Sequence, residues 1–65
     1  MKTFRKQRRM LGLTQHQLAA AAKIAPGRII WAETGRVKLT NAELQRIKDA
    51  LARRAKEVAD AVAND

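Results

Sequence analysis

Residues 13–35, LTQHQLAAAAKIAPGRIIWAETG, predict two short helices joined by a tight turn. Thr14 is a good N-cap for the first helix, because its hydroxyl can accept a hydrogen bond from an amide of the first turn. Apolar side chains then recur at helical spacing, at Leu18, Ala19 and Ala22. Pro26 suits the first position of a second helix, and Gly35 is placed to end it. The stretch therefore indicates two helices that meet at a steep angle.

The segment before this stretch predicts another helix, over residues 2–11. Phe4, Arg8 and Leu11 share one face of it. An arginine among apolar residues requires an acid inside the protein, because an unpaired buried charge is costly. Gly12 follows as the residue that closes this helix.

The segment after this stretch predicts a long final helix. Thr40 and Glu43 have the Thr-x-x-Glu spacing of a capping box. Nothing breaks the helix from Asn41 to about Ala63, a length of about 34 Å at 1.5 Å per residue. Its apolar positions are three or four residues apart, at Leu44, Ile47, Leu51, Ala55, Val58 and Val62. In the loop before it, Val37 and Leu39 are expected to turn inward.

The two halves of this final helix have different expected roles. The first half, through Leu51, is needed to close the core over the preceding helices. The second half has nothing left in the chain to cover, so its stripe is either an exposed tail or a subunit interface. We favour the interface, because small residues allow close helix approach; its residues are Ala55, Val58, Ala59 and Val62. The chain accordingly divides into residues 1–52 and an extension, residues 53–65.

Length and composition restrict the fold to one small all-helical domain. The chain has 65 residues, no cysteine, three glycines and one proline. Disulfides and thiolate zinc sites are therefore excluded, and stability must come from helix packing or a partner subunit. Thirteen residues are alanines, which favour helix while burying little area. No apolar run approaches the roughly 18 residues needed to span a bilayer, and the expected location is cytoplasmic.

Positive charge is concentrated in the first part of the chain. The formal net charge is +8, and residues 1–38 contain nine Lys/Arg against a single acid, Glu33. Residues 39–65 contain five of each sign. This charge distribution predicts a polyanion partner. A solvated basic surface and a surface that binds anionic lipid are the alternatives. The apolar face of residues 2–11 is too thin for a membrane-surface helix.

Taken in order, these residues resemble the helix-turn-helix of the lambda-repressor and Cro type, often called XRE-like. The resemblance covers about residues 4–51 without a gap, and its ordered set is Arg8, Gly12-Leu13-Thr14-Gln15, Leu18-Ala19, Ile29, Glu33, Gly35, Leu44, Ile47 and Leu51. It implies a small bundle of four helices with a long fourth helix that binds double-stranded DNA. It also implies a structural ion pair between Arg8 and Glu33, and Glu33 is the one acid within the first 38 residues.

Three departures from the family pattern stand out. Lys23 occupies the turn position where the family usually has glycine, so a left-handed conformation there would be strained. Ala25 replaces the usual Ser or Thr cap of the third helix. The usual fifth helix is absent, which puts the family's dimer geometry in doubt.

The resemblance places base-reading positions on the third helix, whose first turns sit in the major groove. They fall on Pro26, Gly27 and Trp31, with Arg28 and Ile30 beside them. Arg28 is the side chain able to contact guanine N7 and O6 with two hydrogen bonds, with a phosphate contact as an equal alternative. Trp31 is expected to point outward, onto DNA or a partner surface, with a core position as the third alternative.

Phosphate contacts are expected on both flanks of the reading helix, where they position the protein. The family places one at Gln15, near the positive end of the second helix. The other candidates are His16, Lys23, Thr34, Arg36, Lys38 and Asn41. His16 has no second metal ligand in reach, and no metal, cofactor or small-molecule ligand is expected.

The leading functional hypothesis is a sequence-specific DNA-binding regulator, a Cro-like repressor of bacterial or phage type that acts as a homodimer on a palindromic operator. The alternative is an antitoxin-type or other protein-interaction module built on the same fold. An enzyme is the weakest class, because the chain has one histidine, no cysteine and no phosphate-binding loop.

Overall fold

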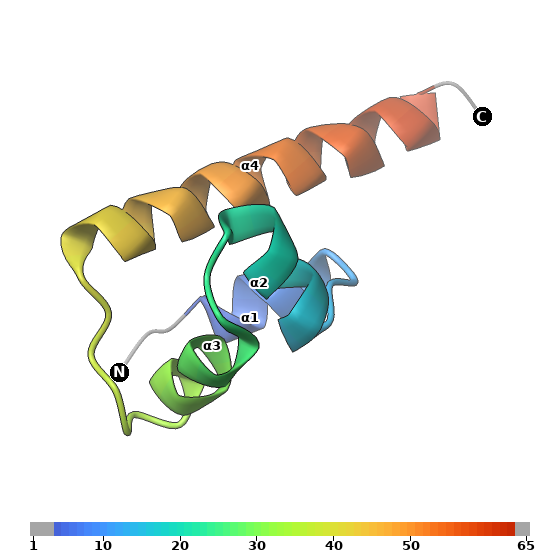
Figure 1. Cartoon of the computed structure of the whole chain (residues 1–65). Helices are drawn as coiled ribbons and strands as arrows, with labels where there is room; N and C mark the ends of the chain where they lie inside the picture. Colours follow the sequence, from blue (N-terminus) through green and yellow to red (C-terminus); the bar gives the residue numbers. More distant parts are fainter. Residues whose placement is uncertain (1–3, 64–65) are drawn as a thin grey trace.

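Four α-helices form the part of the chain that the computed structural model describes, residues 4–63. They are α1 (Arg5–Met10), α2 (Gln15–Ala22), α3 (Pro26–Glu33) and α4 (Asn41–Ala63). Figure 1 shows α4 lying across one side of the other three helices and continuing beyond them. The predicted all-α class, with four helices and a long last one, is confirmed, and residues 4–63 contain no strand.

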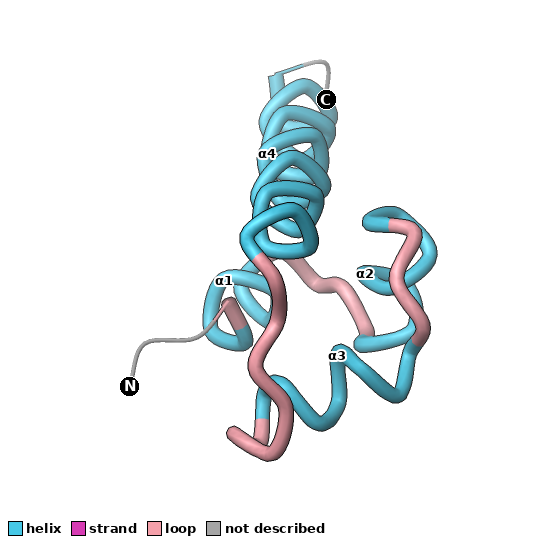
Figure 2. The backbone as a smooth tube through the Cα atoms, turned by 60° about the vertical axis from the view of Figure 1, so that its left-hand side comes forward, coloured by secondary structure: helices cyan, strands magenta, loops and turns pink. Residues whose placement is uncertain are grey.

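The core is built where α2, α3 and α4 meet. Each of these helices contributes one fully buried branched side chain, Leu18, Ile29 and Ile47. Smaller or less central residues complete the cluster, namely Ala19, Ala22, Ile24, Leu39, Ala50 and Leu51. The alanines bring α2 and α4 close together. Figure 2 shows α2 beside the first half of α4, and α3 on the side of the molecule away from α4. As predicted, Leu39 is buried and Val37 is half-buried.

Reciprocal caps define the starts of α2 and α4. The Thr14 hydroxyl accepts from the Gln17 N–H at 3.0 Å, and the Gln17 side chain accepts from the Thr14 N–H at 2.9 Å. Thr40 and Glu43 exchange the same two bonds, at 3.1 and 2.9 Å. Such boxes satisfy two amides that lack helical partners. The predicted start of α4 and its predicted end near Ala63 both match the structure.

The turn between α2 and α3 has the strained backbone that the sequence suggests. Lys23 has φ +57°, in the left-handed region that glycine adopts without strain. Ala25 is the N-cap of α3 and offers no side-chain hydrogen bond, while Pro26 follows at the first helical position. Gly35, with φ +81°, follows Thr34, the C-cap of α3. The reversal between α2 and α3 is therefore made without a glycine.

The first helix is shorter than predicted. The expectation was residues 2–11, whereas α1 runs from Arg5 to Met10; residues 2 and 3 lie outside the described part. The helix ends because the chain turns at Gly12, whose φ is +71°. Arg54 from α4 donates to the Leu11 carbonyl at 3.0 Å and caps this end. Sequence periodicity alone contains no information about that tertiary cap.

The second half of α4 projects from the globule, which gives the described chain an elongated shape of 40 × 19 × 18 Å. Its apolar stripe is exposed throughout, at Ala55, Val58, Ala59 and Val62. Val62 keeps 73% of its surface exposed and Val58 keeps 39%. Arg53 anchors the point of departure by donating to the Ala21 carbonyl at 3.0 Å. None of the helices within residues 4–63 has the length and apolar character needed to cross a membrane.

Candidate nucleic-acid interface

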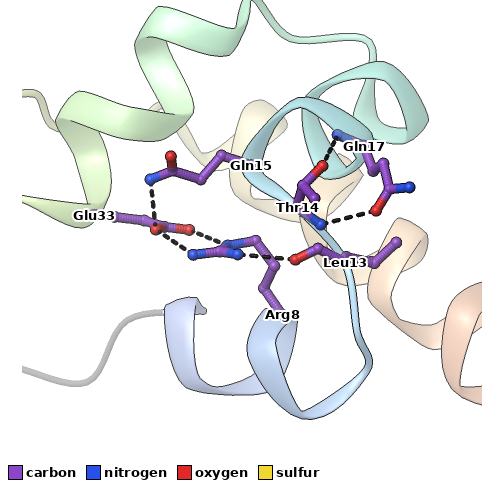
Figure 3. Close-up of polar contacts among 6 residues, drawn as sticks. All are labelled: Arg8, Leu13, Thr14, Gln15, Gln17 and Glu33. Carbon is purple, nitrogen blue, oxygen red and sulfur yellow. Dashed lines mark hydrogen bonds and ion pairs between the residues drawn. The ribbon is translucent and has the colours of Figure 1, made fainter.

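A buried ion pair joins α1 to the end of α3 (Figure 3). Arg8 Nε donates to Glu33 Oε2 at 2.7 Å and Arg8 Nη2 donates to Glu33 Oε1 at 2.9 Å. The side chains are 8% and 1% exposed. Arg8 Nη1 also donates to the Leu13 carbonyl at 2.8 Å. The expected Arg8–Glu33 pair is thus present, and it holds α1, the α1–α2 turn and α3 in one arrangement.

Gln15 completes the environment of Glu33. Its Nε2 donates to Glu33 Oε1 at 3.1 Å, which puts the first turn of α2 beside the last turn of α3. Burial by itself would raise the pKa of the Glu33 carboxyl, but the hydrogen bonds from Arg8 and Gln15 outweigh burial and hold that pKa below its ordinary value. Gln15 was predicted to bind phosphate. In the structure, the Nε2 group of its side chain already donates to Glu33.

The outward face of α3 is formed by the predicted reading residues. Ile29 and Glu33 are buried on the inner side, whereas Pro26, Gly27, Arg28 and Trp31 are exposed and Ile30 is half-buried. Trp31 is 54% exposed, which excludes the core position that was its third alternative. Gly27 and Trp31 are four residues apart and therefore lie on one face.

Arg28 is held by an acid that the sequence did not connect with it. Its Nε donates to Glu43 Oε2 at 2.7 Å and its Nη2 donates to Glu43 Oε1 at 2.6 Å. Arg28 was expected to contact a guanine or a phosphate, and in the structure part of its guanidinium is already bound to Glu43. A guanidinium has five N–H donors in a fixed fork, so the carboxylate covers one edge and leaves the Nη1–Nη2 edge for a further bidentate contact.

Glu43 therefore has two functions, as a helix cap and as an arginine partner. The hydrogen bonds from Arg28, and then the one from the Thr40 backbone, lower the pKa of Glu43 to about 2. The sequence signal for Glu43 was the capping box. Its contact with a residue fifteen positions earlier depends on how the α3–α4 loop returns along α3, which no local pattern shows.

The surface above the first turn of α3 is open. A methyl group added at Gly27 would meet nothing within 4 Å, so packing within the protein does not require this glycine. The first backbone hydrogen bonds of α3 come from the N–H groups of Arg28 and Ile29, both to the Ala25 carbonyl. The Gly27 N–H precedes them and has no helical carbonyl to bind. The first turn of α3 thus exposes the Gly27 backbone, including an N–H donor without a helical partner.

The predicted phosphate-binding residues occupy more than one side of α3. Gln15 and His16 begin α2, beside the end of α3, where Thr34 and Arg36 follow. Lys23 lies at the opposite end of α2, about 12 Å away along the helix axis. Lys38 and Asn41 belong to the segment that leads to Glu43. All but Gln15 are exposed, and the Thr34 hydroxyl donates to the Trp31 carbonyl at 3.0 Å.

The electrostatics of this half of the chain favour an anion. Glu33 and Glu43 are the two acids among the first 48 residues, which contain eleven Lys/Arg. Glu33 is buried, the Glu43 side chain is 12% exposed, and each is bound by an arginine through two hydrogen bonds. Neither carboxylate therefore presents an open negative surface toward a phosphate backbone.

Comparison of the chain with protein-family models, with curated proteins and with solved structures finds no match. Within the described residues, no group of three His, Cys, Asp or Glu side chains could hold a metal ion.

Proposed function

We propose that this protein belongs to the class of helix-turn-helix proteins that bind double-stranded DNA. The observation that carries the proposal is the outward face of α3, where Gly27, Arg28 and Trp31 are all exposed and the space over Gly27 is empty. A short helix with an exposed first turn has the dimensions that the major groove admits. Surrounding lysines and arginines supply the sequence-independent part of the affinity.

Within this class, we propose a Cro-like regulator that occupies a palindromic operator as a homodimer and represses transcription. One module of this size makes few base contacts, so tight specific binding calls for two half-sites about one helical turn apart. The exposed stripe from Ala55 to Val62 supports a paired form, since an apolar stripe on a projecting helix is rarely left in water without purpose.

The contacts divide into base reading and positioning. Arg28 would use its Nη1–Nη2 edge on guanine N7 and O6 while Glu43 keeps the guanidinium plane in place. Trp31 would lie on a thymine methyl or a deoxyribose. Gly27 would let the α3 backbone approach the DNA closely, and its N–H would donate to a phosphate or a base edge.

The test is selection of binding sites from random double-stranded DNA, followed by affinity measurements on the selected sequence at several salt concentrations. We expect a preferred two-fold symmetric site and an affinity that falls steeply as salt rises. Association that is independent of sequence and salt would overturn the proposal. The antitoxin-type alternative predicts tight binding to a protein partner that Trp31→Ala abolishes, with no preferred DNA site.

A further inference from the structure

An open groove runs between α1 and α4, and residues from the end of α3 and from the α3–α4 loop also line it. Its floor is apolar, with Phe4, Met10, Leu44 and Leu51 among its lining residues. Met10 is 75% exposed, the largest exposed fraction among the large hydrophobic side chains of the described chain. The floor of this groove is therefore an apolar surface that residues 4–63 leave uncovered.

The rim of this groove is basic. Lys6 and Arg9 line it from α1, and Lys48 lines it from α4. All three residues are exposed. An occupant must therefore combine an apolar stripe with a surface that is neutral or acidic.

The projecting half of α4 has this combination. Its stripe is apolar, and from residue 55 onward the sequence contains one lysine and three acids, in a chain whose net charge is +8. Glu57 and Asp60 lie on the side of the helix away from Val62, so they act through the field over roughly 10 Å rather than as direct ion pairs. Of all segments of a second copy, this one would be repelled least by the basic rim of the groove.

The groove also leads directly into the stripe. A second, smaller hollow adjoins it and shares Gln7, Met10, Lys48 and Leu51 with it; Ala52 and Ala55 also line this hollow, and Ala55 begins the exposed stripe. Because α4 is one continuous helix, its second half cannot fold back over its own groove. An antiparallel second copy that crosses near Ala55 would cover both grooves at once, and the alanines allow close approach.

We propose that the groove between α1 and α4 receives the second half of α4 of a second copy, reciprocally, with the two-fold axis near Ala55. The inference deepens the homodimer part of the proposed function. Lys48 and Val62 are each seven residues from Ala55 and lie on the same face of α4. The crossing therefore places Lys48 level with Val62 of the partner subunit.

Sedimentation equilibrium of the full chain without DNA tests this geometry. The unaltered protein is expected to dimerise. Val62→Lys, which faces Lys48 of the partner subunit, should raise the dimer dissociation constant by about tenfold or more. Lys48→Glu combined with Val62→Lys should restore dimerisation, because each new lysine then meets a glutamate. Ala20→Lys adds the same charge on exposed α2 and should leave the dimer intact.

Helix content measured by circular dichroism is the folding control, and Val62 makes no core contact that its replacement would remove. A monomeric unaltered protein, a dimer insensitive to Val62→Lys, or a double variant that stays monomeric would each overturn the inference. Half-site DNA binding is measured separately. If DNA binds while dimerisation fails, this interface alone is wrong, whereas a dimer that binds no DNA contradicts the proposed function.

Discussion

Two arginine–glutamate pairs of the same bidentate geometry sit at different depths in this protein. Arg8–Glu33 is almost fully buried and joins three segments of the chain. In Arg28–Glu43, the arginine side chain is 43% exposed and belongs to the outward face of α3. A buried charge that loses its partner is costly, whereas an exposed one regains water. The first pair is therefore a requirement of the fold, and the second is available to a ligand.

The largest expected effect comes from breaking the buried pair. Glu33→Gln leaves the Arg8 guanidinium buried without a counter-charge, and should lower the free energy of unfolding by roughly 3–5 kcal/mol. Thermal unfolding followed by circular dichroism measures this loss. Glu57→Gln, an equal change at an exposed position, is the control and should have little effect. Similar losses of unfolding free energy in the two variants would show that the burial of Arg8–Glu33 adds nothing to its effect on stability.

Replacing both members of the buried pair sharpens the same test. Arg8→Met with Glu33→Leu removes both charges together, so the double variant should regain much of the stability that Glu33→Gln loses. The additional contacts of Arg8 with Leu13 and of Gln15 with Glu33 set how complete the recovery is.

The exposed pair should affect DNA binding more than stability. Arg28→Ala should weaken binding to the selected site by roughly 10- to 100-fold and relax the preference at one base pair, with only a small change in melting temperature. Lys38→Ala is the matched control, since loss of a phosphate contact weakens all sequences equally. Unchanged base preference in Arg28→Ala would remove this residue from the reading surface.

The dependence of the free energy of unfolding on pH, below pH 4.5, should distinguish these two pairs from ordinary surface charges. Glu43 has its pKa lowered from an ordinary value near 4.5 to about 2, and the pKa of Glu33 is also lowered. The contribution of Glu43 is therefore complete above pH 4.5 and is lost as the pH falls toward 2, and the contribution of Glu33 is lost as the pH falls below the ordinary range of a carboxyl. Glu43→Gln keeps a residue able to form the cap and should reduce the loss of stability between pH 4.5 and 2, while Glu33 still titrates. An unchanged slope would mean that the pair contributes nothing to folding.

The smallest effect is expected at Gly27, beside the exposed pair. Gly27→Ala fits the empty space above α3 and should raise the free energy of unfolding by about 0.5 kcal/mol. If DNA approaches the backbone closely there, the same change weakens binding, so stability and affinity move in opposite directions. Ala25→Gly, a change of similar size at the N-cap, serves as the comparison. Stronger DNA binding by Gly27→Ala would exclude close backbone approach.

The helix ends were predictable where the deciding chemistry is local. Thr14 and Thr40 cap α2 and α4 within three residues of themselves, and the turn between α2 and α3 follows from Pro26. Gly12, predicted to close α1, turns the chain there, whereas the bond from Arg54, 43 residues away, to the Leu11 carbonyl had no signal in the local sequence. The pairing of Arg8 with Glu33 was implied by the resemblance, and it agreed with the need of a buried arginine for an acid and with Glu33 being the one acid within the first 38 residues.

The sequence by itself determined four helices, the Thr14 and Thr40 caps and a basic first half, because these depend on periodicity, local hydrogen bonds and charge counts; the Arg8–Glu33 pair was implied by the resemblance. Only the tertiary structure decided that Glu43 holds Arg28 and that an apolar groove lies open beside α4. These features depend on which surfaces meet across many residues of chain. Helical periodicity indicates which face of a helix is apolar, but the assembled fold determines whether that face is covered.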